Sequence, residues 1–203
     1  MYVELADALA QRRMVRALRP DRLDPDVVAR LLAAANRAPS AGFAQGVDLV
    51  VLDGPDETAR YWDVTLAPER RAGFAWPGLL DAPILVVVCA DPAAYVARYA
   101  EPDKLRTGLG EGAEAWGVPF WFVDAGMVTQ NVLLAAVDEG LGACFFGIFD
   151  HEVVVKAALG IPPHVRTVGT VAIGRIAAES GRPGRSSGRA RRGVGDVVHR
   201  GRW

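Results

Sequence analysis

Arginine side chains gather near the start of the chain in a pattern that suits a bound phosphate. Residues 12–16 read Arg-Arg-Met-Val-Arg, so Arg12, Arg13 and Arg16 share one short segment. A guanidinium group can donate two parallel hydrogen bonds to phosphate oxygens, and it stays charged. The segment therefore indicates a phosphate-binding site. The alternative is a solvated helix end, because charge runs are usually surface features and this chain is rich in arginine.

A second polar segment, residues 38–45, reads Ala-Pro-Ser-Ala-Gly-Phe-Ala-Gln. Pro39 is expected to end the preceding helix, because the residue before a proline disfavours the helical conformation. A glycine-containing turn presents backbone N–H groups, and Gln45 adds an amide side chain. Such a turn could line a ligand, although Pro39-Ser40 alone is only a helix stop.

Two more segments could contact a ligand. Residues 139–147 read Glu-Gly-Leu-Gly-Ala-Cys-Phe-Phe-Gly, and glycine lets a backbone approach a flat ligand closely. The alternative is a plain helix C-cap. Arg189, Arg191 and Arg192 lie in a segment rich in Gly, Ser and Arg, which alone could be a basic tail. A dinucleotide-binding loop is excluded, because Gly140-Leu-Gly142 follows a helix and precedes a strand, the reverse of the required order.

Composition narrows the class of protein. The chain has 203 residues and is 51% hydrophobic, enough for one domain with a sizeable core. A net charge of −1 gives no case for nucleic-acid binding. Charged residues interrupt the N-terminal segment and the longer apolar runs, so neither a signal peptide nor a membrane span is expected. Cys89 and Cys144 lie in apolar runs and predict buried free thiols in a cytoplasmic protein. The three histidines lack metal-ligand spacing.

Hydrophobic periodicity predicts an α+β domain with a mixed sheet covered by helices. The expected helices are residues 3–11, 25–37, 120–140 and 151–159. The expected strands are residues 48–53, 83–90, 142–149 and 167–174, while 55–80 is mixed and 91–119 irregular. Residues 125–137 are uncharged, which indicates burial in a core or a subunit interface.

The C-terminus is expected to form a separate arm. Residues 1–178 would form the domain. Residues 179–203 lose apolar character and then regain it at Val197, Val198 and Trp203. An arm with no core of its own is typical of a segment that wraps a partner subunit.

Taken together and in order, these segments resemble the nitroreductase family of FMN enzymes over residues 5–203. The resemblance implies a nitroreductase-like α+β fold and a homodimer with two FMN sites at the subunit interface. It also implies a C-terminal arm that wraps the partner. No side chain is required as a catalytic residue, because the flavin carries the chemistry.

The implied FMN contacts fall into three groups. The ribityl phosphate would be bound by arginines from both ends of the chain: Arg12, Arg13, Arg16, Arg189 and Arg191. The edge of the isoalloxazine ring would be lined, in part from the other subunit, by Pro39, Ser40 and Gln45. The residues beside the ring would be Phe145, Phe146 and Gly147.

The chain departs from the family pattern in places. Met14 stands where the family often has Ser, so a contact with FMN there would come from the backbone. Gln45-Gly46-Val47 replaces the frequent Gln-Pro-Trp, and Gly193-Val194 replaces Pro-Leu. Aromatic residues in the segment 116–122 are either substitutes for the lost Trp or simply core and interface packing.

The resemblance implies an FMN-dependent oxidoreductase. NADH or NADPH would reduce the flavin and leave, and a small organic acceptor such as a nitroaromatic or a quinone would then bind in the same place, a ping-pong mechanism. One alternative is a flavin-destroying reaction like that of dimethylbenzimidazole synthase, which typically carries Asp at the position of Met14. Another is a non-enzymatic protein that sequesters FMN.

Overall fold

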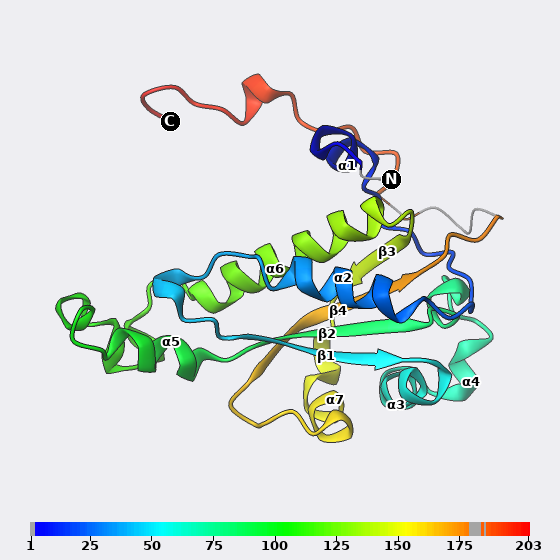
Figure 1. Cartoon of the computed structure of the whole chain (residues 1–203), viewed down its shortest axis with the longest axis horizontal. Helices are drawn as coiled ribbons and strands as arrows, with labels where there is room; N and C mark the ends of the chain where they lie inside the picture. The colour runs from blue at the N-terminus through cyan, green and yellow to red at the C-terminus, as the bar shows by residue number, and fades with distance from the viewer. Residues whose placement is uncertain (1–2, 179–183, 185) are drawn as a thin grey trace.

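Four apolar segments form one sheet in the computed structural model, which describes residues 3–178, 184 and 186–203. The strands are β1 (Val47–Asp53), β2 (Ile84–Ala90), β3 (Gly142–Phe146) and β4 (Arg166–Gly174). Their order is β1-β2-β4-β3, and neighbouring strands run antiparallel (Figure 1). Within the described residues, parallel pairing is limited to an isolated bridge between Met14 and Ala143. The expected α+β class is confirmed, but the four strands form an antiparallel sheet rather than the expected mixed one, and the parallel bridge lies outside their pairing.

Helices cover both faces of the sheet, which explains why β2 is buried along its whole length. The α-helices are α1 (Leu5–Gln11), α2 (Pro25–Ala35), α3 (Pro55–Thr65), α4 (Pro68–Arg71), α5 (Pro92–Tyr99), α6 (Phe120–Asp138) and α7 (Glu152–Leu159). Helices α2 and α6 pack on one face, where Val86 and Val132 belong to one core cluster. Helices α3 and α7 lie on the other face, where Trp62 and Val155 belong to a second cluster. Apolar side chains on both faces of β2 thus join the two clusters into a layered core.

Two helices, α2 and α5, begin at an aspartate whose side chain caps them. Asp24 accepts a hydrogen bond from the N–H of Asp26 at 2.8 Å, and Pro25 occupies the first turn, as the sequence predicts. The expectation that residues 91–119 are irregular is wrong for α5. Asp91 accepts a hydrogen bond from the N–H of Ala93 at 2.8 Å, with Pro92 in the first turn. The charged residues that follow obscured this short helix in the sequence.

Helix α6 is the central helix of the first layer. One face is buried, including Ala125, Val132 and Ala136, whereas the opposite face is partly exposed. Gly140 has φ 68° and follows the helix end, as expected of a glycine C-cap. The helix is long and apolar enough to cross a membrane, but its packing against α2 and the sheet is that of a core helix.

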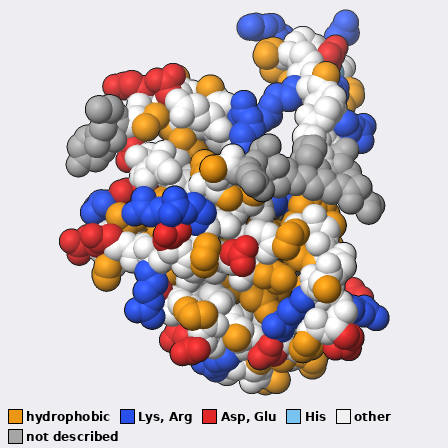
Figure 2. Space-filling model, turned by 90° about the vertical axis from the view of Figure 1, so that its right-hand side faces the viewer, with side chains coloured by type: hydrophobic (Ala, Val, Ile, Leu, Met, Phe, Trp, Pro, Cys, Tyr) orange, Lys and Arg blue, Asp and Glu red, His pale blue; other side chains and the backbone are white. Residues whose placement is uncertain are grey.

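The end of the chain leaves the body of the molecule at the end where α1 is drawn (Figure 1). Seen from the side, this arm projects from the top of the molecule and carries both basic and hydrophobic side chains (Figure 2). Its residue Trp203 is 99% exposed and Val194 is 77% exposed. The expected start of the arm, residues 179–183, and residue 185 lie outside the described residues. The division at residue 178 therefore stays a prediction.

Candidate functional site

The arginine segment is fixed along the outer edge of β3. The N–H of Val15 donates to the carbonyl oxygen of Ala143 at 2.9 Å. The N–H of Phe145 donates to the sulfur of Met14 at 3.4 Å. Met14 therefore contacts the strand with its side chain as well as its backbone, and it ties the segment to the strand that follows α6.

The three arginines of this segment have no acidic partner among the described residues. Arg12 Nη1 is buried, and no hydrogen-bond partner is found for it in the described part of the chain. Arg13 Nη1 donates to the carbonyl oxygens of Ala10 and Arg12, at 2.5 and 3.0 Å. Arg16 Nη1 donates to the carbonyl oxygen of Met14 at 3.2 Å, and its guanidinium lies 5.4 Å from the ring centroid of Trp76. Buried donors are normally satisfied, so the orphaned nitrogen of Arg12 is suited to an anion.

The second predicted group forms a turn with an unusual backbone, which we call the Ser40 turn (residues 40–45). Gly42, Phe43 and Gln45 have φ values of 59°, 58° and 52°. Left-handed conformations are uncommon for residues with a side chain, and each one costs about 1–3 kcal/mol. Ser40 Oγ stabilises the turn by accepting a hydrogen bond from the N–H of Gln45 at 3.1 Å.

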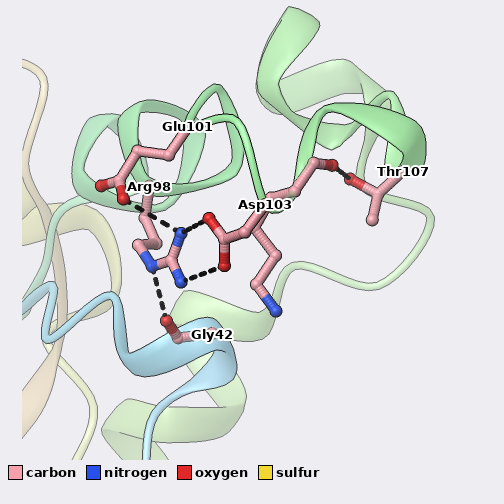
Figure 3. Close-up of polar contacts among 6 residues, drawn as sticks. Gly42, Arg98, Glu101, Asp103 and Thr107 are labelled. Carbon is pink, nitrogen blue, oxygen red and sulfur yellow. Dashed lines mark hydrogen bonds and ion pairs between the residues drawn. The ribbon is translucent and has the colours of Figure 1, made fainter.

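Two side chains from distant helices hold the Ser40 turn from outside. Arg98 Nε donates to the carbonyl oxygen of Gly42 at 2.8 Å (Figure 3). The same guanidinium forms two hydrogen bonds of 2.8 Å to the carboxylate of Asp103, and this contact lowers the pKa of Asp103. On the other side, Asp124 Oδ2 accepts a hydrogen bond from the N–H of Ala41 at 2.8 Å. The strained turn is therefore fixed by α5 and α6 together.

Beside this turn lies a pocket of about 960 Å³. Its lining includes the predicted ring-edge residues Pro39, Ser40 and Gln45, together with Asp124. Asp124 is 1% exposed and also accepts a hydrogen bond from the hydroxyl of Tyr95 at 2.7 Å. Burial raises the pKa of Tyr95, and the hydrogen bond to Asp124 and its negative charge raise it further. The volume and the convergent polar groups are typical of a cofactor or substrate site.

Sequence reasoning missed Asp124, Tyr95 and Arg98. Asp124 carries the one charge within the first 18 residues of α6, Phe120–Val137, and this isolation was a usable signal. Tyr95 and Arg98 lie on the unexpected helix α5, so their role could not be inferred. The aromatic residues of segment 116–122 do not line the large pocket in the described structure. Trp116 and Trp121 instead pack around Tyr95 in the core.

At the end of β3, the backbone rather than the aromatic rings would face a ligand beside the strand. The ring of Phe146 stacks on Trp62 at 5.9 Å within the second core cluster. The ring of Phe145 packs against the first cluster and lies over Gly169, where a Cβ would come within 2.4 Å of it. Gly147 lies against the exposed ring of Phe149. A flat ligand beside this strand would therefore meet backbone of residues 145–147.

The structure brings the arginine segment together with β3 but not with the Ser40 turn. The arginine segment lies where α6 ends and β3 begins, whereas the turn is bound to Asp124 near the start of α6 (Figure 1). From Asp124 to Asp138 the helix rises about 21 Å, at 1.5 Å per residue. Arg189 and Arg191 are exposed on the arm. One chain therefore presents separate parts of the predicted site.

Comparison with known proteins decides the family. A profile of the nitroreductase family matches residues 9–175. The chain belongs to the nitroreductase family. Among its relatives, a 5,6-dimethylbenzimidazole synthase of Rhodospirillum rubrum is 34% identical over 182 residues, which cover 83% of this chain and 80% of that protein. An NADH dehydrogenase of Thermus thermophilus is 28% identical over 194 residues, covering 87% of this chain and 88% of that protein.

Solved structures show the same nitroreductase architecture. A protein of Desulfovibrio desulfuricans, described as a nitroreductase and solved in complex with FMN, superposes with a TM-score of 0.68 at 21% identity. The match covers 98% of this chain and 96% of that one. The resemblance that the sequence motifs indicated is confirmed, and so is the nitroreductase-like fold.

Proposed function

We propose that this nitroreductase is an FMN-dependent NAD(P)H oxidoreductase that reduces a small organic acceptor, such as a nitroaromatic or a quinone, by a ping-pong mechanism. The observation that carries the proposal is the arginine segment beside β3. It has a buried guanidinium nitrogen on Arg12 without a partner, and none of its three arginines is neutralised by an acid in the described part of the chain. A terminal phosphate with several acceptor oxygens matches that donor set.

The proposal includes a homodimer. The phosphate site and the Ser40 turn lie at opposite ends of α6 in one chain, and a short ribityl chain joins the phosphate of FMN to its ring. The Ser40 turn of one copy is too far from the phosphate site of the same copy, so the turn of a second copy would complete the site. The exposed apolar residues of the arm, including Val197 and Trp203, support the same assembly because a partner surface would cover them.

The residues of the chain would bind and orient the reactants. When bound, FMN would accept electrons from NADH or NADPH and pass them to the acceptor. The Ser40 turn would hold the ring edge, and its left-handed backbone is fixed in advance by Asp124 and Arg98. Such prior fixation lowers the entropy cost of orienting a bound ring. Backbone of residues 145–147 would form a flat wall beside it.

A second candidate is a flavin-destroying reaction, because the dimethylbenzimidazole synthase relative is 34% identical. Met14 counts against this reaction, since dimethylbenzimidazole synthases typically carry Asp at the position of Met14. Here the sulfur of Met14 is engaged with the N–H of Phe145. Sequestration of FMN without turnover is a third outcome that the same experiment separates.

The test begins with the absorption spectrum of the purified protein, followed by extraction and chromatography of the flavin. We expect FMN rather than FAD, because the arginine set suits one terminal phosphate. Anaerobic titration with NADH and NADPH should bleach the flavin, and a panel of acceptors should restore its colour. FAD, or no flavin after reconstitution, would overturn the proposal. Bound FMN that neither nucleotide reduces would indicate sequestration, and loss of the flavin with formation of dimethylbenzimidazole would indicate the second candidate.

We also place the enzyme in the cytoplasm. Cys89 and Cys144 are both buried and free. Burial raises the pKa of Cys89 to about 12, so this thiol stays protonated. Free buried thiols are typical of proteins from a reducing compartment.

A further inference from the structure

Asp124 is a buried carboxylate held by neutral donors. It is 1% exposed, and no cationic side chain pairs with it in the part of the chain that the structure describes. Oδ2 accepts hydrogen bonds from the N–H of Ala41 at 2.8 Å and from the hydroxyl of Tyr95 at 2.7 Å. Burying an ionised group is costly, so hydrogen bonds to the charged form are needed to keep it there. Neutral donors stabilise the carboxylate but leave its net charge in place.

That charge faces the pocket that contains the predicted ring-edge residues. Asp124 lines the 960 Å³ pocket together with Ser40 and Gln45. Two other charged residues, Arg37 and Asp48, also line it, but both are exposed and have opposite signs. Water and salt screen exposed charges far more than buried ones. The field in this pocket is therefore dominated by the negative charge of Asp124.

We propose that Asp124 has two roles toward bound FMN: it positions the Ser40 turn, and its charge makes the pocket favour oxidised over reduced FMN. The proposal rests on the proposed function, because it requires the flavin ring in this pocket. Reduction adds electron density to the ring, and a fixed negative charge in a low-dielectric wall opposes that addition. The Asp124 carboxylate would therefore keep the bound flavin a stronger electron donor than a neutral wall would.

The decisive variant is Asp124→Asn. An asparagine side-chain oxygen can accept from both Ala41 and Tyr95, so the turn keeps its support while the charge is lost. The measurement is the dissociation constant of oxidised FMN and of dithionite-reduced FMN, together with the midpoint potential of the bound flavin. We expect the ratio of the two constants to move at least about tenfold in favour of reduced FMN, which for a two-electron couple is a shift of about +30 mV.

Two further variants separate charge from loosened structure. Asp56→Asn removes an exposed negative charge from α3, on the opposite face of the sheet, and we expect the ratio to stay unchanged. Tyr95→Phe removes a donor but keeps the carboxylate, so it should not shift the ratio in the direction of Asp124→Asn. If Asp124→Asn weakens both redox forms equally, or if Tyr95→Phe reproduces its shift, the electrostatic role is wrong while the proposed function stands. If the wild-type protein binds no FMN, the proposed function and this inference both fail.

Discussion

Arg98 and Gly42 are joined by a hydrogen bond of 2.8 Å from the guanidinium to the carbonyl oxygen, although 56 positions separate them in the sequence. The ring of Tyr99, next to Arg98, closes over the same glycine. Helix α5 thus fixes the backbone of the Ser40 turn from one side, while Asp124 fixes it from the other. The turn is built by contacts that are distant in sequence and has little freedom to adapt.

Gly42→Ala should destabilise the protein. Gly42 has φ 59°, and a Cβ there would lie 2.7 Å from Cε2 of Tyr99. We expect a loss of about 1–3 kcal/mol in the free energy of unfolding, measured by urea denaturation. Gly117→Ala is the control, because a Cβ at Gly117 meets nothing within 4 Å. Equal stability of the two variants would show that the turn is less constrained than its contacts indicate.

Arg12→Ala and Arg16→Ala should each weaken FMN binding. Each removes a charged donor from the segment beside β3, so we expect a loss of about 1.5–3 kcal/mol, the usual scale for hydrogen bonds to charged groups. Fluorescence titration of the apoprotein with FMN measures the dissociation constant of each variant. Arg19→Ala serves as the control, since Arg19 already pairs with Asp21 at 2.7 Å. Unchanged dissociation constants for Arg12→Ala and Arg16→Ala would mean that the segment is only a solvated surface.

Glu152 should make the stability of the protein depend on pH in the acidic range. Its carboxylate accepts hydrogen bonds from Arg166 Nε at 2.9 Å and from the N–H of Thr167 at 3.0 Å. The contact with Arg166 is the main cause that lowers the pKa of Glu152 below its ordinary value of 4.5. A lowered folded-state pKa stabilises the protein above that ordinary value, and the contribution is lost as pH falls below it and through the lower folded-state pKa.

The stability difference between wild type and Glu152→Gln should therefore be largest near neutral pH and shrink on acidification below about pH 4.5. Urea denaturation across this range measures it. Partial exposure of the pair limits the size of the effect. A difference that is constant with pH would show that the glutamate contributes through packing rather than charge.

Removal of residues 185–203 should cost both dimer stability and FMN. Val194, Val197 and Trp203 are exposed in the single chain, and the same arm carries Arg189 and Arg191. Because an obligate dimer has no stable monomer, stability of the full-length protein should rise with protein concentration. Sedimentation at several concentrations, with flavin absorbance recorded in the same run, tests both effects. A stable, flavin-loaded monomer would contradict the proposed assembly.

Much of the fold could be predicted because its signals are local. Asp24-Pro25 marks a helix start, Gly140 marks a helix end, and the apolar run of residues 84–90 marks the central strand. Helix α5 has the same start signal at Asp91-Pro92, but the charged residues that follow make the whole segment 91–119 read as irregular. The order of helices and strands predicted a sheet covered by helices, but the strand order and the antiparallel pairing depend on contacts distant in sequence and were not predicted.

The candidate site was predictable only where its motifs are continuous in sequence. The arginine segment and the Ser40 turn are of that kind. Asp124, Tyr95 and Arg98 come from other helices and act through tertiary contacts, so apart from the isolated charge of Asp124 in α6 the sequence carries no signal for them. Phe145 and Phe146 show the opposite problem. The family resemblance implies a place beside the flavin ring for them, which stays a prediction, but the direction of their side chains depends on which core cluster each one joins.

The distance between the arginine segment and the Ser40 turn has a consequence for genetic complementation between mutant chains. In the proposed dimer, each FMN site draws the two motifs from different copies, so damage to one motif and damage to the other can be carried by separate chains. A mixed dimer of two such inactive chains would contain one site with both lesions and one site with neither. Mutations at the two ends of α6 could therefore complement each other, whereas two lesions within one end could not.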